Sequence, residues 1–91
     1  MAQVSVNTMA VVRSIKLCDE VMESYRTTAR KLENDCASAG MNWRDDKYRQ
    51  YASVIDGCTN ALNRPIHELE DCKQTLIRLL RAMEHYEQTS I

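Results

Sequence analysis

Uncharged residues recur along both halves of the chain at alternating steps of three and four residues. The first series consists of Val4, Thr8, Val11, Ile15, Cys18, Met22, Tyr25, Ala29, Leu32 and Cys36. The second series consists of Tyr48, Tyr51, Ile55, Cys58, Leu62, Pro65, Leu69, Cys72, Leu76, Leu79, Met83 and Tyr86. Side chains of a β-strand alternate with a period of two, so strands do not produce this spacing. Each half is therefore predicted to form a long helix whose uncharged seam packs lengthwise against another helix.

A short break between the two series carries the signals of a helix end and a helix start. Gly40 suits the left-handed position just past the first helix, and Asn42 suits the N-cap of the second. Asp45 stands three residues after Asn42, where it can bond back to the cap in a capping box. Because so short a connection makes the helices antiparallel neighbours, we predict an all-α helical hairpin, with helices over about 7–37 and about 43–88.

Pro65 conflicts with a continuous second helix. A proline inside a helix removes one backbone hydrogen bond and costs about 3 kcal/mol. The seam nevertheless keeps its register from Leu62 through Pro65 to Leu69. We therefore favour one continuous helix with a kink near Pro65, and the alternative is a break capped by Asn63 or Arg64 that would give three helices.

The predicted helices differ in length by about 20 Å, at about 45 and about 65 Å. The end of the second helix is therefore expected to project past the first and to form a partner interface. The interface residues predicted in this way are Leu76, Ile77, Leu79, Leu80, Met83 and Tyr86. Such an apolar surface is typical of a contact with another protein, so the hairpin is expected to pair with itself or with a second helical protein as a four-helix bundle.

Composition narrows the function further. The 91 residues form a single domain, 1–91, and 12 Lys and Arg against 13 Asp and Glu give a net charge of −1, which provides no basic field for nucleic acid. The sequence contains no apolar run of the length of a signal peptide core or a transmembrane helix. We therefore expect no membrane insertion and a cytoplasmic location, unless the chain is exported without a cleaved signal peptide.

The four cysteines, Cys18, Cys36, Cys58 and Cys72, belong to the two seams and include no Cys-x-x-Cys pair. They are expected to be small buried hydrophobic residues rather than a disulfide scaffold or a zinc site, and an intermolecular bridge stays open. The predicted register separates them by two helical turns or more, too far for an internal disulfide. We accordingly expect no catalytic residue, no metal and no cofactor, and a protein that is not an enzyme.

Two seam-bearing helices around a short turn, with Trp43 at the exit of the turn, resemble the WXG100 (ESAT-6-like) family of type VII secretion. The resemblance implies a homodimeric or heterodimeric four-helix bundle that serves as a secreted substrate or as the partner or chaperone of a larger secreted effector. The turn here is a variant, since Asp45 stands where the family has glycine. Tyr86 is followed four positions later by Ser90, where the export signal of the family has Asp or Glu. A helper of an effector therefore fits better than an independent substrate.

Both turn residues have a second interpretation. Trp43 is either an exposed recognition residue at the tip or a plug for the end of the bundle. Asp45 either belongs to a motif that a secretion machine reads or simply caps the helix. For the function, a non-enzymatic interaction protein is the leading hypothesis and a structural or adaptor coiled-coil subunit unrelated to secretion is the alternative. A thiol-dependent or metal-dependent enzyme is the third class.

Overall fold

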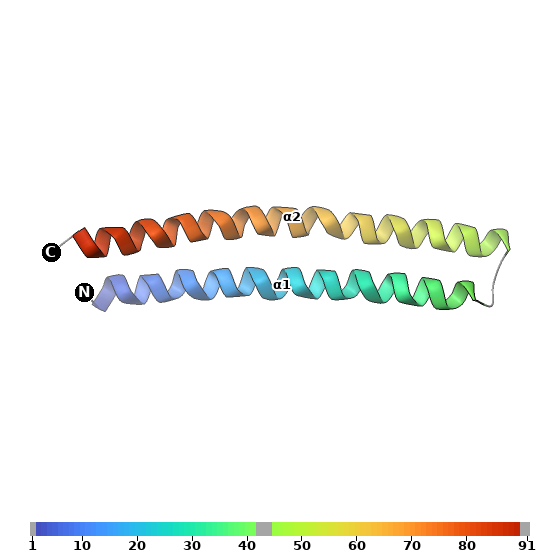
Figure 1. Ribbon diagram of the computed structural model, residues 1–91, viewed down its shortest axis with the longest axis horizontal. Coiled ribbons are helices and arrows are strands. Elements are labelled where there is room, and N and C mark those ends of the chain that lie inside the picture. Colours follow the sequence, from blue (N-terminus) through green and yellow to red (C-terminus); the bar gives the residue numbers. More distant parts are fainter. Residues whose placement is uncertain (1, 42–44, 90–91) are drawn as a thin grey trace.

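The chain forms a hairpin of two long helices. The computed structural model describes residues 2–41 and 45–89, and the side chains of residues 8–41 and 45–86. Helix α1 spans Ala2–Gly40 and helix α2 spans Asp46–Thr89. The two run antiparallel and side by side along their whole length (Figure 1). The all-α hairpin predicted from the seams is confirmed.

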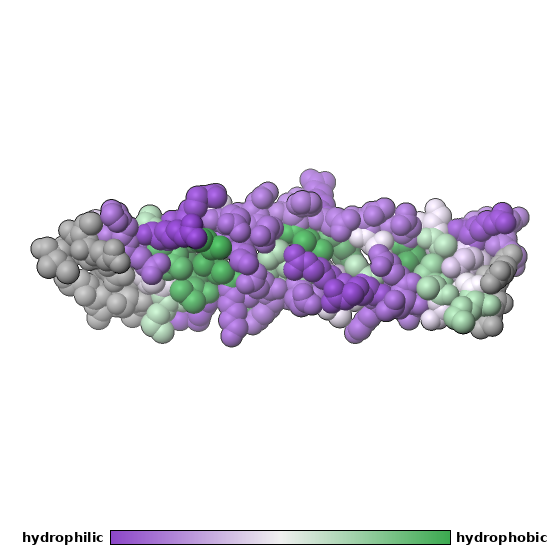
Figure 2. Space-filling view, viewed as in Figure 1, coloured by the Kyte–Doolittle hydropathy of each residue, from purple (hydrophilic) through white to green (hydrophobic). Residues whose placement is uncertain are grey.

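The hairpin is a narrow rod. Its extents are 71 × 16 × 13 Å and its radius of gyration is 20.6 Å, against about 12 Å for a compact domain of this length. Figure 2 shows hydrophobic residues gathered in patches along the middle of the rod, between hydrophilic residues that cover both edges. With only one neighbour, each helix buries one strip of its surface and leaves the rest exposed.

The observed helix ends differ from the predicted ones. Helix α1 begins at Ala2 rather than near residue 7, and it continues to Gly40. No proline or glycine interrupts this stretch, so intrinsic propensity extends the helix further than the capping signals indicated. Helix α2 begins at Asp46 rather than near residue 43. The two helices therefore have similar lengths and end close together (Figure 1), and the predicted overhang beyond residue 76 is wrong.

The seam of α1 is the one that the spacing predicted. Every member of that series from Thr8 to Cys36 is buried or half-buried. Met22, at the middle of α1, is 1% exposed and is the one buried hydrophobic residue among the side chains described. A three-four spacing of uncharged residues is thus sufficient to identify the packed face of this helix.

The seam of α2 is only half correct. The buried and half-buried residues that follow the three-four spacing are Tyr48, Ala52, Ile55, Thr59, Leu62, Ile66, Leu69, Lys73, Leu76, Leu80 and Met83. Every second member lies one residue later than predicted, and the predicted Cys58, Cys72, Leu79 and Tyr86 are exposed. We call the observed set the core seam.

Two polar residues explain this error. Thr59 is 6% exposed, and its hydroxyl donates to the Asp56 carbonyl of the same helix at 2.9 Å. Lys73 is half-buried, and its ammonium group pairs with Asp19 of α1 at 2.8 Å. A search for uncharged residues rejects Lys73, although a lysine can bury its methylene chain while its charged end reaches a partner.

Helix α2 runs through Pro65 without interruption, so the three-helix alternative is wrong. The carbonyl that Pro65 leaves without its usual donor belongs to Ala61, which lies on an exposed part of the helix where water can bond to it. The kink at Pro65 stays a prediction. Neither helix, within the described ranges, carries a segment long and apolar enough to cross a membrane.

Candidate interaction surface

Asp45 caps the start of α2. The backbone N–H of Tyr48 donates to the Asp45 carboxylate at 3.0 Å, and the N–H of Arg49 donates to the Asp45 carbonyl at 3.2 Å. Asp45 is therefore itself the N-cap, instead of the third residue of a box capped by Asn42. This geometry supports the capping interpretation of Asp45, while Asn42 and Trp43 lie outside the described residues.

The aromatic ring of Tyr48 joins the two helices next to the turn. Its hydroxyl donates to the Cys36 carbonyl at 3.1 Å and lies 3.8 Å from the Cys36 sulfur. The side-chain hydrogen bond with the Cys36 thiol, followed by burial, raises the pKa of Tyr48 above its usual value. A hydrogen bond that holds the proton on the phenol therefore ties the end of α1 to the start of α2.

Gly40 leaves room for this contact. A Cβ atom at Gly40 would lie 2.5 Å from the Tyr48 hydroxyl oxygen. Gly40 is the last residue of α1 and its φ is not positive, so the predicted left-handed conformation is wrong. The glycine is needed for the close approach of an aromatic ring, rather than for its backbone freedom.

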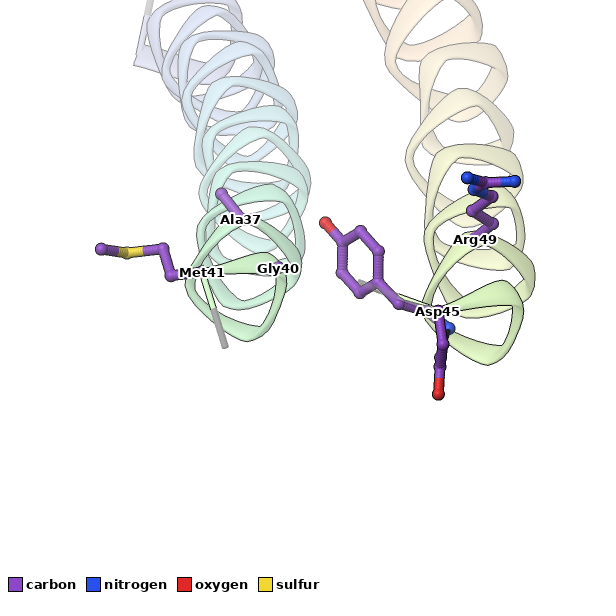
Figure 3. Close-up of a pocket in the computed structure, with 6 residues that line it drawn as sticks. Ala37, Gly40, Met41, Asp45 and Arg49 are labelled. Atoms are coloured by element: carbon purple, nitrogen blue, oxygen red, sulfur yellow. Dashed lines mark hydrogen bonds between the residues drawn. The ribbon is translucent and has the colours of Figure 1, made fainter. Parts of the chain in front are cut away.

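An open pocket of about 480 Å³ lies between the two helix ends at the turn. Ala37, Gly40 and Met41 line it from the side of α1, and Asp45 and Arg49 from the start of α2 (Figure 3). The Met41 side chain points away from α2 in this view.

Charged residues gather on one side of the hairpin, which we call the charged side. Asp19 of α1 pairs there with Lys73 of α2, and the hydrogen bond to Asp19 raises the pKa of Lys73. Glu33 of α1 and Asp56 of α2 line one groove between the helices on this side. Arg26 and Glu70 also lie close enough to Lys73 to affect its titration.

Helix α2 carries a second strip with a single charged residue, which we call the second seam. It consists of Tyr51, Val54, Cys58, Ala61, Pro65, Glu68, Cys72, Thr75, Leu79 and Ala82. Each member stands one residue before a member of the core seam, so the second seam lies about 100° around the helix. Its one charged residue, Glu68, pairs with Arg64 at 3.0 Å.

Apart from the half-buried Tyr51 and Pro65, the members of the second seam are exposed to solvent. Val54 is 64% exposed and Leu79 is 48% exposed. A shallow groove lined by Asp71, Cys72, Thr75 and Leu76 lies beside it. Exposed apolar residues at regular helical spacing are typical of a surface that another helix covers.

Helix α1 extends the same surface. In an antiparallel helix pair, the residues that flank the packed face on one side of one helix lie on the same side of the pair as the corresponding residues of the other helix. On α1, the residues that continue the surface of the second seam lie on the side of the packed face opposite to Asp19. Its exposed apolar members are Leu17 and Val21, at 58% and 41% exposure. Their neighbours Ser14 and Thr28 donate to carbonyls of α1 at 3.0 Å. We call this face of the hairpin, formed by the second seam with Leu17 and Val21, the uncharged side.

The predicted interface residues divide into two groups. Leu76, Ile77, Leu80 and Met83 are half-buried, while Leu79 and Tyr86 are exposed. Cys58 and Cys72 are exposed, so their predicted place in the core is wrong. The sequence of α2 contains a second series of residues at three-four spacing, and each of its members stands one residue before a member of the core seam. This second series identifies the uncharged side from the sequence.

All four cysteines are free thiols, with Cys18 and Cys36 half-buried and Cys58 and Cys72 exposed. In the part of the chain that the structure describes, no three His, Cys, Asp or Glu side chains gather in a way that could hold a metal ion. No protein-family model, no curated protein and no solved structure matches this chain.

Proposed function

We propose that this chain is a non-enzymatic helical interaction protein. It acts by pairing with a second helical chain, either itself or another protein, so that four helices form one bundle. The observation that carries this proposal is that the hairpin buries one hydrophobic side chain and leaves many large apolar side chains exposed. Met22 is the one buried hydrophobic residue among the described side chains, whereas eight large apolar side chains, Met9, Val12, Leu17, Val21, Met41, Val54, Leu79 and Tyr86, are between 41% and 76% exposed. A hairpin this poorly buried gains stability when a second pair of helices covers it.

The resemblance to the WXG100 family supports a more specific role. We propose that the chain is the partner or chaperone of a larger secreted effector of a type VII secretion system. The antiparallel hairpin and the Trp43-x-Asp45 turn carry this proposal. The alternative is a structural or adaptor coiled-coil subunit unrelated to secretion. A neighbouring gene for a long effector with a similar N-terminal hairpin favours the first role.

The proposed location is the cytoplasm, with export without a cleaved signal peptide as the alternative. Mass spectrometry of the culture medium and of the cell extract from the source organism separates the two. We expect the chain in the extract, and in the medium only together with an effector. Its appearance in the medium after deletion of every candidate effector would contradict a helper role.

The pairing is tested by light scattering in reducing buffer over a tenfold range of concentration. We expect a constant dimer mass for the wild-type chain and a lower mass for Leu79→Asp with unchanged helical circular dichroism. Val12→Asp is the matched control, because Val12 is 49% exposed and Leu79 is 48% exposed, but Val12 lies on the charged side. A monomer that binds a hydrophobic dye and melts without cooperativity would indicate a different partner chain. A monomer with a sharp, high melting transition would contradict the proposed function.

A further inference from the structure

Cys18 of α1 and Cys72 of α2 lie next to one contact between the helices. Each is the residue immediately before a member of the ion pair in which the Lys73 ammonium group lies 2.8 Å from the Asp19 carboxylate. One residue of an α-helix rises by about 1.5 Å, so the two cysteines lie within about one helical turn of the same level along the rod. The register predicted from the sequence separated the cysteines of the two helices by two turns or more, and for this pair it is wrong.

The two cysteines also lie on the same side of the helix pair. Asp19 is on the charged side of α1, and Cys18 is half-buried at the opposite edge of the packed face. Cys72 belongs to the second seam of α2, which borders this same edge, and it is exposed. Two thiols that are more than fifty positions apart in the sequence are therefore neighbours along one edge of the contact between α1 and α2.

We propose that Cys18 and Cys72 form a redox-sensitive pair, which a low-molecular-weight disulfide converts into an intrachain disulfide. The thiolate of the exposed Cys72 attacks one sulfur of the small disulfide, so that a mixed disulfide forms at Cys72 and one small thiol leaves. The thiolate of Cys18 then attacks the Cys72 sulfur and releases the second small thiol. The protein gives up two protons and two electrons, and both end on the two small thiols. This inference does not depend on the proposed pairing with another chain.

Helix α2 contains the packed face that this disulfide requires. A disulfide needs Cα atoms about 4.4–6.8 Å apart, so Cys72 has to turn from its exposed position toward α1. Its row in the second seam repeats every seven residues and carries no charge. The members of this row are Tyr51, Cys58, Pro65, Cys72 and Leu79. This row stands one residue before the row of Lys73 in the core seam, so exchanging the two rows needs a rotation of α2 by about half of the 100° between residues.

The ion pair and the disulfide compete for the arrangement of α2. In the observed arrangement Lys73 faces Asp19, and the hydrogen bond between them holds α2 with Cys72 turned outward. The rotation that brings Cys72 to Cys18 moves Lys73 away from Asp19. A reducing environment keeps both cysteines as thiols and favours the ion pair, whereas an oxidising one favours the disulfide. The pair therefore couples the redox state of two thiols to the face that α2 presents to solvent.

The test equilibrates the full reduced chain with oxidised and reduced glutathione until the products no longer change. Non-reducing peptide mapping by mass spectrometry identifies each disulfide. We expect an intrachain bond between Cys18 and Cys72 in a chain that keeps its helical circular dichroism, and its complete loss in Cys72→Ser. Cys58→Ser is the matched control at an exposed cysteine of the same row, and it should leave the bond in place. The chain in denaturant should instead join Cys58 to Cys72, because a short loop closes more readily in an unfolded chain.

Asp19→Asn tests the competition with the ion pair. It should raise the equilibrium constant of the Cys18–Cys72 bond by up to about fivefold, the factor that corresponds to a partly exposed ion pair. Glu20→Gln is its control, because it removes an exposed carboxylate one residue further along α1. Equal equilibrium constants in the two variants would exclude the competition.

Three results would overturn the redox pair itself. The first is glutathione bound to Cys72 with no bond to Cys18 after equilibration. The second is a Cys72 disulfide between two chains in place of the intrachain bond. The third is a Cys18–Cys72 bond that forms only with loss of the helical circular dichroism, which would assign it to the unfolded chain.

Discussion

The hydroxyl of Tyr48 donates a hydrogen bond to the backbone carbonyl of Cys36 at 3.1 Å, across the gap between the two helices. This carbonyl lies in the last two turns of α1. The contact therefore ties the end of α1 to the start of α2 next to the turn. It forms because Gly40 leaves the space that the ring occupies.

We expect Gly40→Ala to destabilise the hairpin and Gly57→Ala to stabilise it. The new Cβ at position 40 would lie 2.5 Å from the Tyr48 hydroxyl oxygen, whereas a Cβ at position 57 would meet nothing within 4 Å. An alanine in place of an exposed helical glycine adds about 1 kcal/mol of stability. Chemical denaturation measures both variants, and equal stabilisation by both would show that Tyr48 does not occupy this space. In a Tyr48→Ala background the loss at position 40 should largely disappear.

We expect the hairpin to lose stability at alkaline pH. The pKa values of Tyr48 and Lys73 are raised in the folded chain above their usual 10.0 and 10.5, in each case chiefly by a hydrogen bond. A raised pKa means that folding favours the protonated group, so this stability is complete below the unfolded pKa and disappears as the pH rises through the folded one. Thermal melts between about pH 9 and about pH 12 should show the decline. A chain with Tyr48→Phe and Lys73→Met should show a smaller one, and an identical profile would exclude both groups as its cause.

Met22→Ala is expected to reduce the free energy of unfolding by about 2–5 kcal/mol, because it deletes a buried side chain at the middle of the rod. Met22 is 1% exposed. Met9→Ala is the control at a methionine of the same helix that is 58% exposed, and it should change the stability by less than about 0.5 kcal/mol. Comparable losses in the two variants would show that Met22 is not the centre of the core.

Asp45→Ala should reduce the stability by about 0.5–2 kcal/mol, since it removes the carboxylate that accepts from the Tyr48 N–H. Asp45→Ser provides the control, because a serine hydroxyl can also cap a helix. If capping is the whole role of Asp45, the serine variant keeps both the stability and any binding to a partner. A serine variant that is stable but no longer binds would instead assign Asp45 to a recognition motif.

The hairpin and the seam of α1 follow from the sequence because both depend on local patterns. Three-four spacing of uncharged residues defines a helical face, and the short break around Gly40 requires the helices to reverse direction. The uncharged side was predicted only in part, since its member Leu79 was predicted as an interface residue but Cys58 and Cys72 were assigned to the core. The sequence of α2 contains two series of residues at three-four spacing, one residue apart, and the prediction used a single series as the packed face.

The sequence by itself determined the class of fold, the antiparallel order of the helices and the packed face of α1. Only the tertiary structure decided which of the two registers of α2 faces α1, because that choice depends on partners in the other helix. Lys73 occupies the core seam because Asp19 of α1 lies 2.8 Å from its ammonium group. Cys58 and Cys72 are exposed because this ion pair and the buried Thr59 move every second position of the packed face of α2 by one residue. A contact between residues more than fifty positions apart is not encoded in the spacing within either helix.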